Sequence, residues 1–170
     1  MVIKFDGSCS STDQATVHAV VPATTQMVKR ALIRMELAAN KEGGAYDSNY
    51  LRWFGRPDRR RAHYALRTYR QMFRILSTKS IEFACDPNKQ NYARVFPGLK
   101  RKIHLQRYFW SAPLTGLNSK PGVIVHELAH ELLRAGDFRY STDRAERLAA
   151  NSAWLAIRNA DNYEYFAETA

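Results

Sequence analysis

The sequence predicts an α+β fold in a single domain, residues 1–170. Apolar residues recur at helical spacing through the first half, short alternating runs follow, and an apolar helical segment near residue 128 carries a histidine pair. We expect two long N-terminal helices, a small antiparallel sheet, the histidine-bearing helix and C-terminal helices. The chain has 170 residues, 45% of them hydrophobic, which is enough for a sizeable core, and no run approaches the roughly 20 apolar residues of a membrane span.

The N-terminal half predicts two long helices with a short one between them. Ser10–Asp13 is typical of a helix start, and Pro22 should either kink the first helix or mark a later start. Lys41–Gly44 should end this helix. The aromatic segment Tyr50–Gly55 predicts one or two helical turns, and a second long amphipathic helix is expected after Pro57.

The period then changes to that of strands. Ser80–Cys85, Tyr92–Phe96 and Lys102–Tyr108 are short, partly alternating runs separated by Asp-Pro-Asn and Pro-Gly turns, which predicts a small antiparallel sheet. Phe109–Gly116 is expected to be a loop. It leads to a helix with Pro121 in its first turn, where the missing N–H of proline costs nothing.

The chain carries a net charge of +10, concentrated in Arg56–Arg61 and continuing to Arg74. Such a surface could bind nucleic acid or an anionic cell envelope. Because the arginines fall on one side of an amphipathic helix, a solvated helix face is the preferred interpretation.

The N-terminus and the two cysteines indicate whether the protein is exported from the cell. Met1–Asp6 has no apolar signal-peptide core, so we expect either a mature form or export by another route. Cys9 and Cys85 fit one disulfide in an exported protein, or alternatively two separate buried thiols. Composition alone leaves both alternatives open.

The strongest motif is His126-Glu127-x-x-His130. On a helix the two histidines lie one turn apart on the same face, so both imidazoles can bind one metal ion, while Glu127 can reach a water molecule at that metal. A chance pair on a helix surface is the alternative. The apolar residues around the motif favour a buried helix, in which ionisable groups usually have a function.

A catalytic zinc ion needs a third protein ligand. The extended pattern with a third histidine is excluded, because Leu133 stands where glycine is required and Gly136 where the histidine would be. The downstream acidic candidates are Asp137, Asp143, Glu146 and Asp161.

At these residues the chain resembles the aspzincins, the family of deuterolysins and peptidyl-Lys metalloendopeptidases. The segments that carry the resemblance are Asp6–Ser11, Trp53–Gly55, Phe109–Gly116, His126–His130, Asp137–Tyr140 and Asn159–Glu168, which cover nearly the whole chain. The family's Asp-x-x-Tyr spacing favours Asp137 over Asp143 as the third zinc ligand. The chain departs from the pattern at Ser141, where the family has glycine, and in a shorter loop at Arg134–Gly136.

The resemblance implies a zincin-like fold and a single catalytic zinc ion bound by His126, His130 and Asp137. It also implies a disulfide between Cys9 and Cys85, while Gln106 replaces a cysteine of a second family bridge.

The residue types then suggest a mechanism for peptide hydrolysis. Glu127 would be the general base, and Tyr140 would donate a hydrogen bond to the oxyanion, although a core tyrosine is the alternative.

Asp161 and Glu164 share a helix face. Taken alone, they could be a helix cap and a solvated acid. In Lys-specific members of the family, an acidic pair at this spacing binds the residue after the scissile bond, so we expect cleavage on the amino side of lysine. By its place in the matched strand, Tyr92 would add an aromatic wall to that pocket.

Two other functions remain open at this stage. One is a deuterolysin-like protease of broad specificity. The other is a secreted toxin or effector domain with a structural zinc ion, whose basic face binds nucleic acid or an envelope polymer. We expect a secreted monomer that acts on polypeptides.

Overall fold

The computed structural model describes residues 1–40, 47–96, 99, 101–133 and 136–170. The helices are α1 (Ser11–Asn40), α2 (Ser48–Phe54), α3 (Arg59–Thr78), α4 (Arg107–Ser111), α5 (Lys120–Leu133), α6 (Thr142–Asn151), α7 (Ala153–Ala156) and α8 (Ala160–Glu168). The strands are β1 (Val2–Phe5), β2 (Ser80–Asp86), β3 (Ala93–Val95) and β4 (Lys102–Gln106). The α+β class is therefore confirmed. The helix end expected at Lys41–Gly44 lies outside the described residues.

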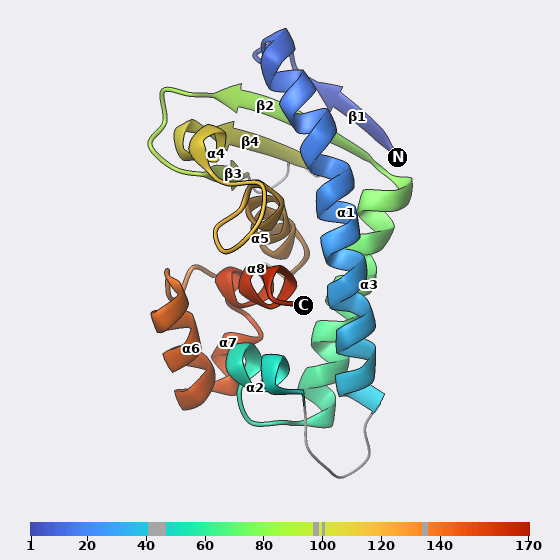
Figure 1. Ribbon diagram of the computed structural model, residues 1–170, viewed down its shortest axis with the longest axis vertical. Coiled ribbons are helices and arrows are strands. Elements are labelled where there is room, and N and C mark those ends of the chain that lie inside the picture. Colours follow the sequence, from blue (N-terminus) through green and yellow to red (C-terminus); the bar gives the residue numbers. More distant parts are fainter. Residues whose placement is uncertain (41–46, 97–98, 100, 134–135) are drawn as a thin grey trace.

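The sheet is mixed, and the prediction of an antiparallel sheet is wrong in this respect. Its strand order is β1-β2-β4-β3, in which β1 and β4 both run parallel to β2 and only β3 is antiparallel to its neighbour β4. Parallel neighbours need a long connection, and the chain supplies it with the helices between β1 and β2. Strand β3 is left at the sheet edge, beside α5 (Figure 1).

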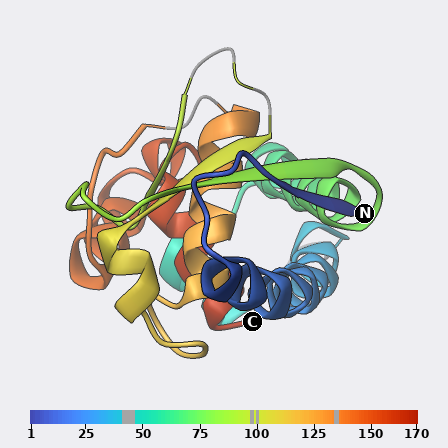
Figure 2. The same cartoon turned by 90° about the horizontal axis from the view of Figure 1, so that it is seen from above.

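The two long helices lie side by side and support one end of the sheet, as Figures 1 and 2 show. Helix α1 begins at Ser11 and continues through Pro22, so the alternative of a later start is wrong. Asp58 caps α3 by accepting a hydrogen bond from the backbone N–H of Arg61 at 2.9 Å. The buried Tyr69 of α3 donates its hydroxyl to the carbonyl of Tyr163 at 2.7 Å, which joins α3 to the C-terminal helix.

The segment after β4 is another correction. The expected strand over Lys102–Tyr108 ends at Gln106. Its last two residues and the first three of the expected loop instead form the short helix α4, which buries Phe109. Its N-cap residue, Gln106, makes no capping hydrogen bond through its side chain, so the local signal that predicts a helix start is absent.

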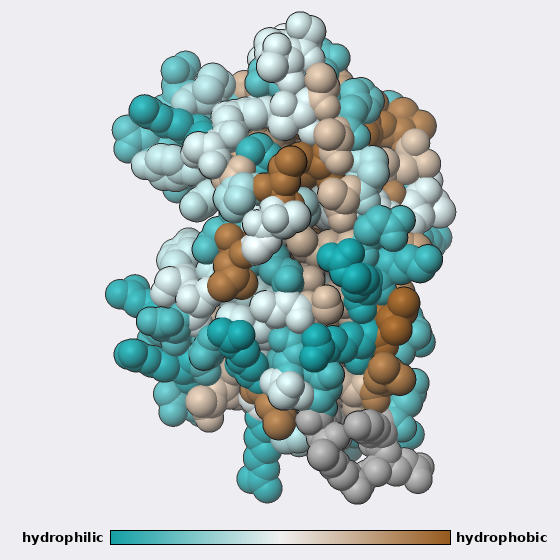
Figure 3. Space-filling view, in the orientation of Figure 1, coloured by the Kyte–Doolittle hydropathy of each residue, from teal (hydrophilic) through white to brown (hydrophobic). Residues whose placement is uncertain are grey.

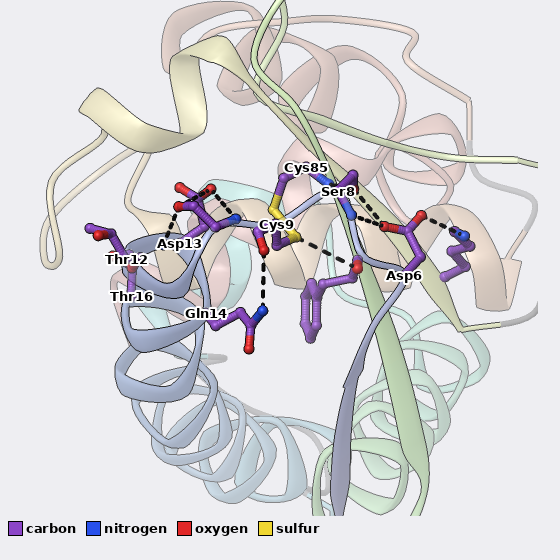
Figure 4. The surroundings of a disulfide bond; sticks show 11 residues. Asp6, Ser8, Cys9, Thr12, Asp13, Gln14, Thr16 and Cys85 are labelled. Atoms are coloured by element: carbon purple, nitrogen blue, oxygen red, sulfur yellow. Dashed lines mark hydrogen bonds and ion pairs between the residues drawn. A yellow bond between two sulfur atoms is a disulfide. The ribbon is translucent and has the colours of Figure 1, made fainter.

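The disulfide implied by the family resemblance is confirmed: Cys9 is bonded to Cys85. It joins the segment just before α1 to the end of β2, and Figure 4 shows the polar contacts around it. The backbone N–H of Cys85 donates to the Ser8 hydroxyl at 2.8 Å, and that hydroxyl donates to Asp6. The bridge therefore fixes β2 just before the chain turns toward the edge strand β3.

Helix α5 lies beneath the sheet and is buried on most sides. Glu168 of α8 accepts hydrogen bonds at 2.7 and 2.8 Å from the backbone N–H and hydroxyl of Ser119, which immediately precedes α5. This carboxylate caps a helix from a distant part of the chain, which secures α5 against α8. Although α5 is apolar, no helix in the described part of the chain is long and apolar enough to cross a membrane.

Candidate active site

One face of α5 opens into a cavity of about 1270 Å³. Figure 3 shows the surface hollowed at its left edge, between the part that carries the sheet and the part that carries α6. The cavity is lined by the β3 edge, α5, the segment leading into α6, and α8. The lining residues that the sequence singled out are Tyr92, His126, Glu127, His130, Asp137, Tyr140, Asp161 and Glu164. The structure thus brings all eight predicted site residues to one cavity.

Three ligand atoms meet at the centre of this cavity. His126 Nε2 lies 2.9 Å from His130 Nε2, and Asp137 Oδ1 lies 3.2 Å from the first and 3.0 Å from the second. In tetrahedral zinc sites with bonds near 2.0–2.1 Å, neighbouring ligand atoms are about 3.3 Å apart. The triangle therefore fits one zinc ion, and all three residues line the cavity.

The charge around the triangle also fits a divalent cation. Burial lowers the pKa of His126, but hydrogen bonds with Asp137, Asp161 and Glu164 outweigh this effect and raise that pKa well above its ordinary value. Three carboxylates thus surround one imidazole, so the site has an excess of negative charge. A bound cation would offset that excess.

The other acidic candidates for the third ligand are placed differently. Asp143 is exposed in the first turn of α6, and Glu146 pairs with Arg52 at 2.6 Å. Asp161 contacts His126 on Nδ1, the ring nitrogen that faces away from the triangle, at 3.0 Å. The geometry therefore favours Asp137.

Glu127 lies beside the triangle, and only 4% of its surface is exposed. Burial raises the pKa of its carboxyl, and the charges of His126 and His130 partly oppose that rise. A base with a raised pKa holds a proton more readily.

Tyr140 is 58% exposed and lines the cavity, so the alternative of a core tyrosine does not describe its position. Burial of its hydroxyl and a hydrogen bond with Asp137 raise its pKa to about 12. The hydroxyl therefore remains a hydrogen-bond donor at neutral pH.

Asp161 and Glu164 both approach His126 Nδ1, at 3.0 and 3.1 Å, and both are almost fully buried. Asp161 also accepts a hydrogen bond from the backbone N–H of Ser141 at 3.1 Å. These contacts fix the orientation of the His126 ring, as carboxylates behind metal-binding histidines usually do. Neither carboxylate is the solvated acid that sequence alone allowed, and both still border the cavity.

Tyr92 lies at the other wall of the cavity, next to the edge strand. Its ring packs edge-on against Tyr108, with the ring centroids 5.7 Å apart, and 43% of its surface is exposed. It thus offers an aromatic surface to the cavity.

Asn159 is a residue whose role the sequence does not reveal. Its Oδ1 accepts hydrogen bonds from the backbone N–H groups of Phe138 and Arg139, at 2.9 and 3.2 Å, and its Nδ2 donates to the Arg139 carbonyl and to Asn162. This fully buried amide therefore holds the segment that follows Asp137. Because Asn159 precedes a helix, it looks like an N-cap, yet its side chain makes no capping hydrogen bond.

The backbone conformation at Ser141 explains why the family has glycine at this position. Its φ of 78° and ψ of 152° lie in a region that only glycine adopts without strain. Its N–H nevertheless reaches Asp161, so the site maintains the strained conformation.

We expect Ser141→Gly to raise the free energy of unfolding by about 1 kcal/mol, since glycine relieves the strain. Denaturant unfolding of the purified protein would measure this change. Ser152→Gly is the matched control, because Ser152 has an ordinary φ of −152° and caps α7, so that variant should be less stable. Equal loss of stability in both variants would contradict the strain argument.

A His-Glu-x-x-His helix beneath a small sheet, with its histidines open to a cavity edged by a strand, is the architecture of the zincin class of metallopeptidases. The profile of the aspzincin family, described as lysine-specific metallo-endopeptidase, matches residues 38–168. The chain belongs to the aspzincin family.

Individual relatives agree with this assignment. The chain is 33% identical over 168 residues to an extracellular protease of Aeromonas hydrophila, covering 98% of this chain and 47% of the relative. It is 31% identical over 169 residues to a peptidyl-Lys metalloendopeptidase of Grifola frondosa, covering 98% and 47%. It thus spans about half the length of these two relatives. The solved structure of a zinc peptidase from Grifola frondosa matches with a TM-score of 0.84 at 31% identity, covering 95% of this chain and 97% of that one.

Proposed function

We propose that this protein is a secreted, zinc-dependent endopeptidase that cleaves polypeptides on the amino side of lysine. The observation that carries the proposal is the triangle of ligand atoms from His126, His130 and Asp137, with Glu127 beside it in an open cavity. The family assignment supports peptide hydrolysis. The disulfide, and the relative named an extracellular protease, support secretion.

His126, His130 and Asp137 would hold one zinc ion, which supplies Lewis-acid activation of water and of the scissile carbonyl. Glu127 accepts a proton from the attacking water and returns it to the leaving amine nitrogen. Tyr140 donates its hydroxyl proton in a hydrogen bond to the oxyanion that develops on the carbonyl oxygen. The edge strand β3 offers backbone groups with which an extended substrate can pair.

The preference for lysine rests on Asp161 and Glu164. If Nε2 holds the metal, the His126 imidazole has a single N–H, at Nδ1, and one N–H cannot satisfy both carboxylates fully. Asp161 accepts a further hydrogen bond, from the backbone N–H of Ser141. For Glu164, the hydrogen-bond contact that the structure describes is the one with His126. Burial raises the pKa of Glu164, opposed by His126. A lysine ammonium entering the cavity would offset the cost of that buried carboxylate.

The test is mass-spectrometric mapping of cleavage sites in an unfolded protein substrate, with and without a zinc chelator. We expect chelator-sensitive cuts before lysine. In Glu164→Gln the ratio of cuts before lysine to cuts before other residues should fall about tenfold, the loss of roughly 1.4 kcal/mol of discrimination. Glu146→Gln is the matched control: Glu146 lies on α6 and pairs with Arg52, outside the residues that line the cavity, and its variant should keep the wild-type pattern.

Zinc content must be measured for each variant, because Glu164 contacts His126. Cuts at mixed residues by the wild type would refute the lysine pocket and favour a broad-specificity, deuterolysin-like protease. A wild-type protein that binds one zinc ion but makes no cuts would refute the peptidase. It would then favour a toxin or effector domain with a structural metal.

A further inference from the structure

Helix α3 carries a straight row of basic side chains on its outer face. Arg60, His63, Arg67, Arg70 and Arg74 are three or four residues apart and all exposed, and we call them the arginine stripe. At 1.5 Å per residue the stripe extends about 21 Å along the helix. Its spacing of three and four residues places neighbouring side chains next to one another on one side of α3.

Few acidic side chains balance the positive charges of the arginine stripe, whereas a helix face that is only solvated usually carries charges of both signs. Helix α3 contains six arginines and no acidic residue. Among the ion pairs of the described residues, the stripe has one, between Arg70 and Glu36 at 3.0 Å. Like charges at these spacings destabilise a helix, and arginines in its first turn oppose the helix dipole. The sequence therefore accumulates unfavourable interactions on this helix that an anionic partner would relieve.

The surface along the stripe is concave. A shallow groove of about 470 Å³ is lined by Arg60, His63, Tyr64, Leu66, Arg67 and Arg70. In it the Arg67 guanidinium lies over the Tyr64 ring, 5.6 Å from the centroid, so an aromatic surface and guanidinium groups face the same groove. Arginine is suited to phosphate because its planar group donates two parallel hydrogen bonds.

The groove and the cavity are separate surfaces. None of the residues that line the cavity belongs to α3. Helix α3 lies at the opposite side of the molecule from α6 (Figure 1), and Figure 3 shows the hollow on the side of α6. A partner bound along the stripe would leave the cavity open.

We propose that the arginine stripe binds the phosphodiester backbone of a nucleic acid. A row of about 21 Å spans roughly six base pairs at 3.4 Å each. An anionic membrane is a poorer match, because helices that lie on membranes insert large apolar side chains. Among the described residues, none of the large apolar side chains that are exposed belongs to α3. The stripe would hold the protein on a nucleic acid without a change at the catalytic groups.

The experiment is fluorescence anisotropy of a fluorescein-labelled 20-base-pair DNA duplex titrated with the purified protein at several salt concentrations. Phosphate contacts by the four arginines of the stripe predict a slope of log affinity against log salt of about −3.6. In the triple variant Arg60→Gln, Arg67→Gln, Arg74→Gln, affinity at 100 mM salt should fall at least tenfold. The slope should become less negative by about 2.7, or roughly 0.9 for each lost contact.

The matched control is Arg144→Gln, Arg147→Gln, Arg158→Gln, which removes the same charge from exposed arginines outside α3 and should keep the wild-type slope. Circular dichroism melting separates folding from binding, since removal of like charges should leave α3 at least as stable. Equal loss of DNA affinity in both triple variants would overturn the proposal, because binding would then depend on the net positive charge of the whole protein and not on the stripe. So would binding to anionic phosphatidylserine vesicles or heparin without binding to the duplex.

Discussion

The Glu127→Gln variant is expected to lose about 10²- to 10⁴-fold in kcat while it binds zinc as the wild type does. Glutamine keeps the size and the buried position of the side chain but cannot accept a proton from water. His126, His130 and Asp137 are unchanged, so the ligand triangle remains. Hydrolysis of a peptide with one internal lysine measures kcat, and atomic absorption measures the zinc content.

Two aspartates provide the controls for this experiment. Asp137→Asn should lose both zinc and activity, because Asp137 Oδ1 lies 3.0 Å from His130 Nε2. Asp143→Asn should keep both, since Asp143 is exposed on α6. Full activity of Glu127→Gln would refute the assignment of the general base. Loss of zinc in Asp143→Asn, without loss in Asp137→Asn, would reverse the assignment of the third ligand.

The elements with strong local signals are those that sequence analysis predicts well. Helix α3 follows its capping residue Asp58, and α5 begins at Lys120, one residue before the proline expected in its first turn. The direction of the strands could not be predicted in this way, because turn residues report only on neighbours in sequence. One of the two parallel neighbours of β2 is β1, and α1, α2 and α3 separate these strands in the chain. Strand β1, with four residues, is not among the strands that the sequence predicts.

The site residues also divide into those with a local sequence signal and those whose position depends on the fold. The His126-Glu127-x-x-His130 motif is local and has a direct chemical meaning, so the sequence is sufficient to find it. Choosing between Asp137 and Asp143 required the family resemblance, because the distance from either to the histidines depends on the fold. The contacts of Asp161 and Glu164 with the far side of His126 could not be inferred from their spacing on α8, since they depend on how α8 packs against α5.

Asn159 is the clearest case of a residue that only the structure reveals. It lies twenty residues or more from the backbone groups it holds, and its amide makes four hydrogen bonds while fully buried. Two of those bonds fix the N–H groups of Phe138 and Arg139, directly after Asp137. Removing the amide would take away the acceptor that holds these two N–H groups and would free the segment that positions the Asp137 carboxylate.

We therefore expect Asn159→Ala to weaken zinc binding by roughly 10- to 100-fold, as measured by competition with a fluorescent chelator. Asn159→Asp keeps an acceptor for the Phe138 and Arg139 N–H groups but loses the donor to the Arg139 carbonyl, so its zinc affinity should be intermediate. Asn151→Ala is the matched control, because Asn151 is exposed at the end of α6 and should bind zinc normally. If Asn159→Ala lowers stability but leaves zinc affinity unchanged, Asn159 supports the fold alone and does not position Asp137.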